Sequence, residues 1–157
     1  MSNLSTTNEI LSNMQNVWVT TFAGGFHFGT PQEIDNIHNK TLPLLFVYTP
    51  QTRFETNDIQ SSQWLAKTEW TVVIYNNLPS TYNVTDDLAV AGLWDTMENQ
   101  LLVWYESVYN TFETQGKIMN VTSPLTVTRL KESSNDRLLG LKATFGWDYY
   151  RRCLTLN

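Results

Sequence analysis

Few residues in this sequence have the types and spacing that chemistry requires. His27 and His38 are the only two histidines, and neither stands at metal-ligand spacing from a cysteine or another histidine. Cys153 follows Arg151 and Arg152, whose charges favour a thiolate, but no recognisable general base accompanies it. We therefore expect no catalytic residue, no metal ligand and no cofactor, and a protein that is not an enzyme.

The acidic and glycine clusters have simpler explanations than a ligand site. Asp86 and Asp87 stand where a helix is expected to begin, so capping and the helix dipole account for them. Asp95 and Glu98 follow on the outer face of that helix, where solvated carboxylates are usual. Gly24-Gly25 lacks the strand, the glycine-rich turn and the lysine of a phosphate-binding loop. The sequence therefore predicts neither a metal nor a nucleotide.

The composition is that of a folded protein with an unusual polar surface. Of its 157 residues, 41% are hydrophobic and 13% are aromatic, which excludes an intrinsically disordered chain. Only 16% are charged, whereas 21 Thr and 15 Asn supply much of the remaining polar surface. Because Thr and Asn cost less to bury than charged side chains, such a surface suits permanent interfaces.

The sequence also indicates the cellular compartment in which the protein is expected to function. A single cysteine cannot form an internal disulfide, so a reducing compartment is expected. The first residues have neither the basic start nor the apolar run of a signal peptide. The apolar runs at 42–48 and 101–105 are too short to span a bilayer. We expect a soluble protein without a membrane partner.

Helical periodicity is strongest in the middle of the chain. Apolar residues recur every three or four positions from Val90 to Phe112, as on a helix that lies across a sheet. Thr85 is the N-cap candidate of this long helix. A first helix is expected over 3–19, and a short one over 31–38 begins with the capping-box pattern Thr-Pro-Gln-Glu.

Strand patterns occur on both sides of the long helix. Strands are expected over 42–48 and 69–75 before it, and a hairpin of 125–131 and 138–149 after it. In the last strand apolar and polar residues alternate strictly, so its apolar set faces the long helix. Two glycines of this strand fall on the opposite face, where another group is expected to approach closely.

This order of elements predicts an α+β fold in a single domain over residues 1–157. We expect an antiparallel four-stranded sheet packed by one long helix, with additional N-terminal helices in a helical segment over residues 1–40. Residues 49–66 are polar and irregular, and are expected to form an extended loop or arm that reaches outward.

Charge is distributed unevenly along the chain. Residues 1–116 hold 3 Lys or Arg and 12 Asp or Glu, a net charge of −9. Residues 117–157 hold 7 Lys or Arg and 3 Asp or Glu, a net charge of +4. Such asymmetry is typical of a nucleic-acid tail or of two complementary faces on one subunit, and it also arises when one hairpin carries a solvated basic face.

Four runs of the sequence, in this order, resemble a known family. They are LPLLFVY, EWTVVIY, DDLAVAGLWDTMENQLLVWYESVY and RLLGLKATFGWDYYRRC. They resemble the small tail-terminator and neck (head–tail connector) proteins of tailed bacteriophages, which have a terminal helix, a strand pair, a long helix across the sheet and a closing strand pair. The resemblance covers roughly residues 40–153.

The resemblance implies a structural virion protein. Such proteins form a ring of six or twelve copies at the portal–tail junction, beside adjacent portal, neck or tail proteins, and are assembled in the host cytoplasm. DNA passes through the ring without specific binding. The candidate subunit-interface residues are then the charged residues of the expected arm and of the basic hairpin: Arg53, Glu55, Asp58, Arg129, Lys131, Arg137, Lys142, Arg151 and Arg152.

A soluble binding module is the alternative function. The sheet face that carries Arg129 and Lys142 would then hold a nucleic acid or a protein partner. Arg151 and Arg152, beside two tyrosines, have the residue types that stack on and neutralise a nucleic acid. Two arginines in an acidic protein are weak evidence for that partner.

Overall fold

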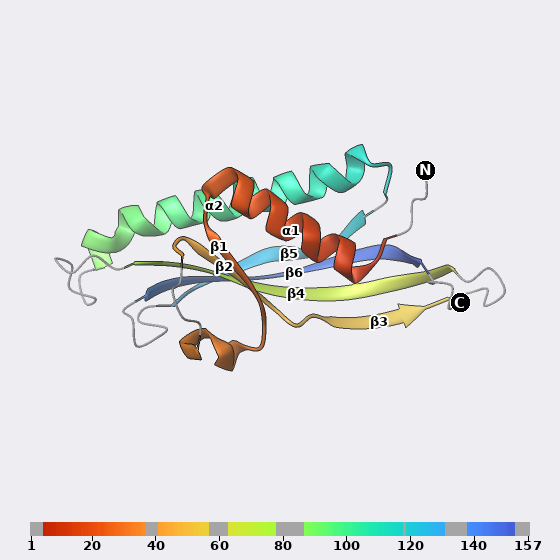
Figure 1. Cartoon of the computed structure of the whole chain (residues 1–157), viewed down its shortest axis with the longest axis horizontal. Coiled ribbons are helices and arrows are strands. Elements are labelled where there is room, and N and C mark those ends of the chain that lie inside the picture. The colour runs from red at the N-terminus through yellow and green to blue at the C-terminus, as the bar shows by residue number, and fades with distance from the viewer. Residues whose placement is uncertain are drawn as a thin grey trace.

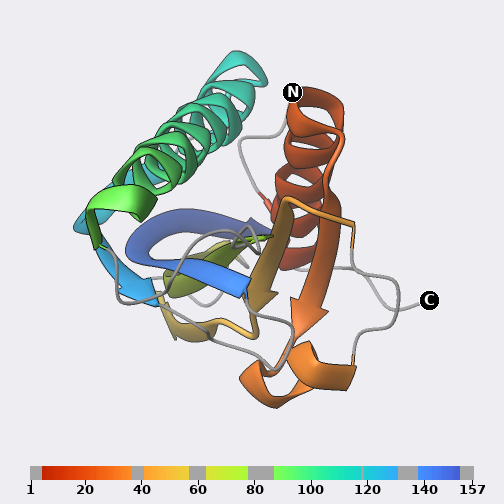
Figure 2. The ribbon, with the colours of Figure 1, turned by 90° about the vertical axis from the view of Figure 1, so that its left-hand side faces the viewer.

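The chain folds into a mixed α+β structure in two layers. The computed structural model describes residues 5–36, 41–56, 63–77, 87–117, 119–130 and 138–152. The elements in chain order are α1 (Thr7–Phe22), β1 (Gly25–Gly29), the 3₁₀ helix η1 (Pro31–Asn36), β2 (Leu44–Tyr48), β3 (Gln51–Glu55), β4 (Gln63–Asn77), α2 (Asp87–Thr114), β5 (Met119–Leu130) and β6 (Leu138–Arg152). Both α-helices cover the same face of the sheet, and η1 lies on the other side (Figure 1, Figure 2).

A long antiparallel pair forms the centre of the sheet. β4 and β6 pair over fifteen residues, from Gln63 opposite Arg152 to Asn77 opposite Leu138. β5 pairs with β6 on one side, and β2 and β3 pair with different halves of β4 on the other. β1 extends the sheet beyond β2 as its parallel neighbour.

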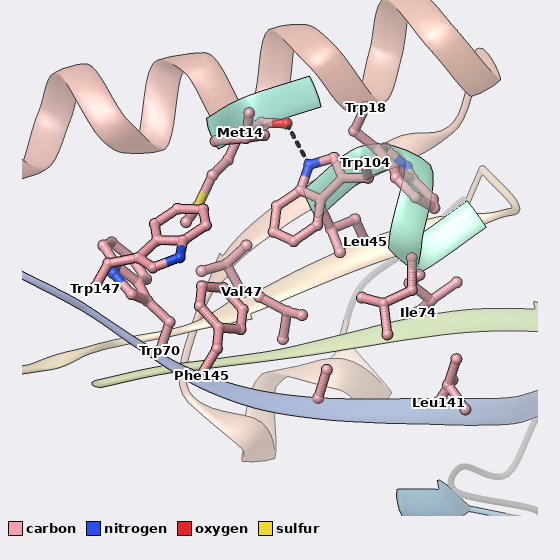
Figure 3. Packing of buried hydrophobic residues seen from close by; sticks show 14 of the residues in the cluster. Met14, Trp18, Leu45, Val47, Trp70, Ile74, Trp104, Leu141, Phe145 and Trp147 are labelled. Atoms are coloured by element: carbon pink, nitrogen blue, oxygen red, sulfur yellow. Dashed lines mark hydrogen bonds between the residues drawn. The ribbon is translucent and has the colours of Figure 1, made fainter. Parts of the chain in front are cut away.

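α2 supplies one layer of the main hydrophobic core. The apolar stripe predicted from Val90 to Phe112 is confirmed, since all seven of its residues are buried: Val90, Trp94, Met97, Leu101, Trp104, Val108 and Phe112. They pack on alternate residues of β4 and β6, which include Trp70, Ile74, Leu141 and Phe145 (Figure 3). At 1.5 Å per residue, the 28 residues of α2 span about 42 Å.

A buried hydrogen bond ties the two helices to each other. Trp104 of α2 donates its indole N–H to the backbone carbonyl of Met14 in α1, with 3.1 Å between the atoms (Figure 3). Thr6 is the N-cap of α1, and its hydroxyl accepts from the amide of Glu9. The buried residues of α1, Ile10, Met14 and Trp18, face the core.

The number and direction of strands differ from the prediction. The described sheet has six strands instead of four, and its β1–β2 pair is parallel, so the sheet is mixed. β1 consists of Gly-Phe-His-Phe-Gly, a short run between glycines that carries no strong strand pattern. Two α-helices cover the sheet, whereas one long helix was expected to do so.

The prediction of an arm over residues 49–66 is wrong for its described parts. Gln51–Glu55 forms β3, which folds back on β4, and β4 itself begins at Gln63. β3 is an edge strand with a single apolar residue, so its sequence reads as a polar loop. Residues 57–62 lie outside the described residues.

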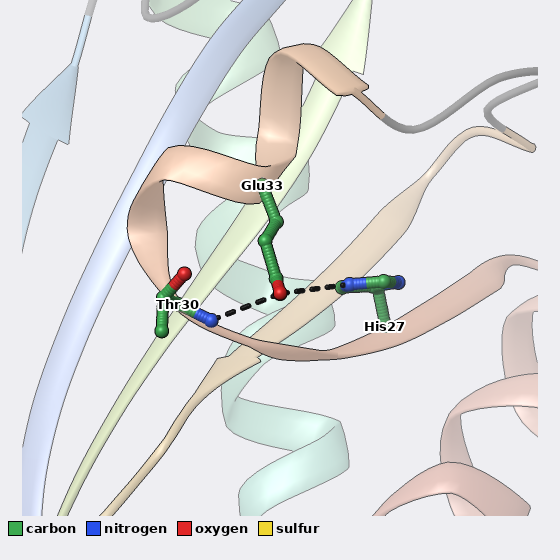
Figure 4. A network of polar contacts seen from close by, with 3 residues as sticks. All are labelled: His27, Thr30 and Glu33. Carbon is green, nitrogen blue, oxygen red and sulfur yellow. Dashed lines mark hydrogen bonds and ion pairs between the residues drawn. The ribbon is translucent and has the colours of Figure 1, made fainter.

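The short helix expected over 31–38 is a 3₁₀ helix over Pro31–Asn36. The carboxylate of Glu33 accepts from the amide of Thr30 at 3.0 Å, as in a capping box, and also contacts His27 Nε2 at 3.3 Å (Figure 4). The amide of Glu33 bonds the carbonyl of Thr30 at 3.1 Å, which is the pattern of a 3₁₀ turn. His38 lies outside the described residues.

Two buried tryptophans allow the helix-to-helix bond to be tested. Trp104→Phe removes the bond to Met14, whereas Trp70→Phe removes an indole N–H that has no partner in the described structure. Both side chains are fully buried, so the two losses of volume are comparable. We expect Trp104→Phe to lower the free energy of unfolding by about 1 kcal/mol more than Trp70→Phe does. Urea unfolding measures both, and an equal loss would contradict a stabilising role of this bond.

Candidate functional site

The face of the sheet opposite α1 and α2 divides into an apolar half and a polar half. In the apolar half, a second cluster of buried residues comprises Leu44, Phe46, Val73, Tyr75 and Leu138. His27 of β1 packs its ring against Phe46, with 5.0 Å between the ring centres. The polar half lies at the other end of β4, where neither α-helix covers it (Figure 1).

Cross-strand pairing places charged and hydroxyl side chains together in the polar half. Arg53, Lys67, Asp148 and Asn120 lie opposite one another in one row across β3, β4, β6 and β5. Directly opposite residues share a face of the sheet, so this row points away from the helices. In this part of β4 the residues that face the helices include Ala66 and Trp70, whereas the alternate residues Lys67 and Glu69 are charged and point the other way.

A groove of about 750 Å³ runs over this row, and we call it the polar groove. Its lining comes from β3, β4, β5 and β6: Gln51, Thr52, Arg53, Lys67, Thr68, Glu69, Thr122, Ser123 and Asp148. The lining thus combines two cations, two carboxylates, hydroxyl groups and one amide.

The charges of the polar groove largely neutralise each other. Glu55 accepts from Arg53 Nε at 3.2 Å and from Lys67 Nζ at 3.3 Å. Burial raises the pKa of the Asp148 carboxyl, although the charge of Lys67 and a hydrogen bond with Thr122 act in the opposite direction. Asp148 is therefore a carboxylate whose charged form is penalised by its position in the fold.

A bulge in β5 brings two hydroxyl groups over β6. The pairing of β5 with β6 shifts register between Val121 and Ser123 and again before Thr126. A Cβ atom on Gly146 would lie 2.7 Å from Thr122 Oγ1 and 2.9 Å from Ser123 Oγ. The close approach predicted opposite the apolar face of this strand is confirmed at Gly146. A glycine is needed there because any side chain would displace these hydroxyls.

The polar groove has the groups for hydrogen bonding to a polar partner. No histidine or cysteine stands among its lining residues, so the described groove lacks a nucleophile paired with an imidazole base. Within the described parts of the chain, no three His, Cys, Asp or Glu side chains gather as metal ligands would. Neither α1 nor α2 has the length and apolar character to cross a bilayer.

Open strand edges, at β5, β3 and β1, form a second candidate surface. Within the described residues, β5 pairs only with β6, and β3 pairs only with β4. We call their outer sides the β5 edge and the β3 edge. Each carries an exposed apolar side chain on the helix side of the sheet, namely Val121 at 51% exposure and Phe54 at 49%.

The predicted interface residues do not gather in one place. Arg53 and Glu55 lie on β3 beside the polar groove, whereas Arg129 of β5 bonds Glu98 of α2 on the other face. Lys142 lies on the open face, level with Val73 and Thr128, and Arg151 stands beside Ser5 at the start of the chain. Asp58, Lys131, Arg137 and the side chain of Arg152 lie outside what the structure describes.

Sequence reasoning missed Lys67, Glu69, Thr122, Ser123 and Asp148, which line the polar groove. The signal that could have found them is the alternation of β4, in which Lys67 and Glu69 fall on the same face as Asp148 once β4 and β6 are paired. Without that pairing, the five residues are spread over more than eighty positions.

Comparison of the sequence with protein-family models and with curated proteins gives no match.

The raised pKa of Asp148 predicts a pH-dependent stability difference. At a pH between the ordinary pKa of 3.8 and the higher pKa of the folded state, the Asp148 carboxyl is more protonated in the folded protein than in the unfolded chain. The free energy of unfolding contributed by this carboxyl therefore falls as pH rises through that window. Asp148→Asn removes the ionisation, so its stability relative to the wild type is expected to rise with pH over the same window.

Urea unfolding at a series of pH values, from acid to neutral, measures this difference. Glu69→Gln, which removes an exposed carboxylate from the same groove, controls for the loss of one negative charge. A stability difference between Asp148→Asn and the wild type that stays constant or falls with rising pH would contradict the assignment.

Proposed function

We propose that this protein is a structural virion component that assembles into a ring of identical subunits at the portal–tail junction of a tailed bacteriophage. It would act as a neck or tail-terminator ring around the path of the genome, in contact with adjacent portal, neck or tail proteins. The resemblance of its sequence runs to such proteins suggests this place in a virion. The order of helix, strands, long helix and closing strand pair supports the same assignment.

The observation that carries the proposal is the pair of unlike sheet edges. Both helices cover one face, and the β5 edge and the β3 edge remain on opposite sides of the β4–β6 pair (Figure 1). A ring of identical subunits needs heterologous contacts, in which one surface of a subunit meets a different surface of its neighbour. Two unlike edges on opposite sides provide such a pair of surfaces.

The charge of α2 suits a ring through which DNA passes. The sequence of α2 holds five carboxylates, at Asp87, Asp95, Glu98, Glu106 and Glu113, and no Lys or Arg. An acidic surface repels the phosphate backbone, so DNA that moves along it is not retained. A lumen lined by such a surface would serve transport of a genome rather than recognition of its sequence.

The polar groove favours one alternative, a module that binds a polar protein segment. Nucleic acid is a poorer partner for it, because Arg53 and Lys67 share the carboxylate of Glu55. Arg129 is likewise paired with Glu98, and Lys117 with Glu9. Phosphate contacts need cations whose charge is not already neutralised by the protein.

The ring proposal predicts a large mass in solution. Light scattering of the purified chain over a range of concentrations is expected to give a mass several times 18.1 kDa, and electron microscopy is expected to show closed rings. A mass that stays at the monomer value at the highest concentrations would contradict self-assembly and leave the binding module as the better function.

The same proposal predicts no appreciable affinity for DNA. In a fluorescence anisotropy titration at micromolar protein and physiological salt, duplex DNA is expected to stay unbound. Lowering the salt is expected to change this little, because the basic side chains named above are paired with carboxylates. Tight binding that weakens steeply with salt would instead favour the nucleic-acid-binding module.

A further inference from the structure

The first part of the β5 edge lacks the charged side chains that usually protect an exposed strand. Its first ten residues, MNVTSPLTVT, contain no charged side chain, and most of the strand is exposed. Long edge strands normally carry charges, above all Lys, because unpaired N–H and C=O groups attract a second strand. The only devices of this kind in β5 are its bulge and Pro124, which lacks an N–H. The bulge begins after Val121, so these devices leave Met119, Asn120 and Val121 as the regular stretch that can pair with a second strand.

The β3 edge matches that stretch in position and direction. The cross-strand partners can be followed from β3 through β4 and β6 to β5. Gln51 and Ser123 then fall in the same row across the sheet, and so do Phe54 and Met119. β3 therefore stands opposite the part of β5 that precedes Pro124, at the other side of the sheet. Each step from β3 through β4 and β6 to β5 is antiparallel, so β3 and β5 run in opposite directions.

A copy displaced sideways and rotated clear of the neighbour's β1, with its strands still running the same way, would therefore add β3 to β5 as an antiparallel strand. Antiparallel pairing is the more stable arrangement per residue. In that register Phe54 of the incoming copy lies opposite Met119 and diagonal to Val121 on the helix side of the joined sheet, where Phe54 and Val121 are about half exposed in the single chain. The contact would cover the most exposed apolar residue of each strand.

The helices disfavour the other simple arrangement, in which β5 pairs with β5 of a second copy. α2 lies over the β5 side of the sheet, where its Glu98 bonds Arg129 of β5 (Figure 2). A two-fold axis at a β5–β5 seam would bring two acidic α2 helices together. Pairing with β3 instead places α2 beside the α1 side of the neighbour, and α1 has only one charged residue, Glu9, which bonds Lys117.

From these observations we infer that neighbouring subunits join by β-strand addition, with β3 of one copy antiparallel to β5 residues 119–121 of the next. This inference rests on the self-assembly proposed above and names the seam between subunits. Main-chain hydrogen bonds provide the contact, and the register sets Phe54 opposite Met119 and diagonal to Val121.

The test places a lysine on each edge separately. Phe54→Lys blocks the β3 edge, and Val121→Lys blocks the β5 edge. Leu102→Lys, on α2 at 56% exposure, and Phe28→Lys, on β1 at 40% exposure, are the matched controls. All four positions are exposed, and circular dichroism with thermal unfolding establishes that each variant folds.

Light scattering of each variant alone and of mixtures then separates the outcomes. We expect Phe54→Lys and Val121→Lys each to be monomeric, and both controls to keep the wild-type mass. An equimolar mixture of the two edge variants is expected to give a dimer of about twice 18.1 kDa, because one intact β5 edge then meets one intact β3 edge.

Each other outcome has a distinct meaning. Edge variants that keep the wild-type mass would overturn the seam and leave the ring intact. A mixture that gives no dimer would overturn the pairing of β5 with β3, and a monomeric Phe28→Lys would overturn the choice of β3 over β1. A wild-type chain that is itself monomeric would contradict both the seam and the proposed ring.

Discussion

The fifteen-residue antiparallel pairing of β4 with β6 is the contact on which the rest of the structure depends. It sorts the side chains of both strands by parity, so that Trp70, Ile74 and Leu141 point to the helices. The residues between them point the other way, and Lys67 lies opposite Asp148 on that face. One register therefore builds the core and the polar groove together, and a slip by one residue would exchange the two faces.

Both α-helices cover the same face of the sheet, and this leaves part of the other face open. α1 and α2 bury the helix side, and the bond from Trp104 to Met14 holds the two helices as one layer. Within the described residues, no helix covers the polar half of the opposite face. Its charged side chains form ion pairs with one another, as Arg53 and Lys67 do with Glu55. The open groove follows from this one-sided arrangement.

The sequence predicted the parts of the fold that carry strong periodicity. The stripe of α2 and the alternation of β6 involve many apolar residues at fixed spacing, and both lie where expected. β1 and β3 were missed because an edge strand has one partner and few buried residues, so its sequence resembles a loop. The polar groove could not be predicted, since pairing across four strands is what joins Arg53 to Asp148.

In β5, uncharged polar residues such as Thr and Asn occupy an exposed edge strand. Its run of Asn, Thr, Ser and Val has the β-branched residues that favour an extended strand, and none of the charges that would keep a second strand away. The first charged residue of β5 is Arg129, which forms an ion pair with the carboxylate of Glu98 on α2. The strand thus combines high β-propensity with a neutral edge over the segment that lies level with β3. A low content of charged residues is a hazard for a protein that stays alone and an advantage for one that joins copies of itself edge to edge.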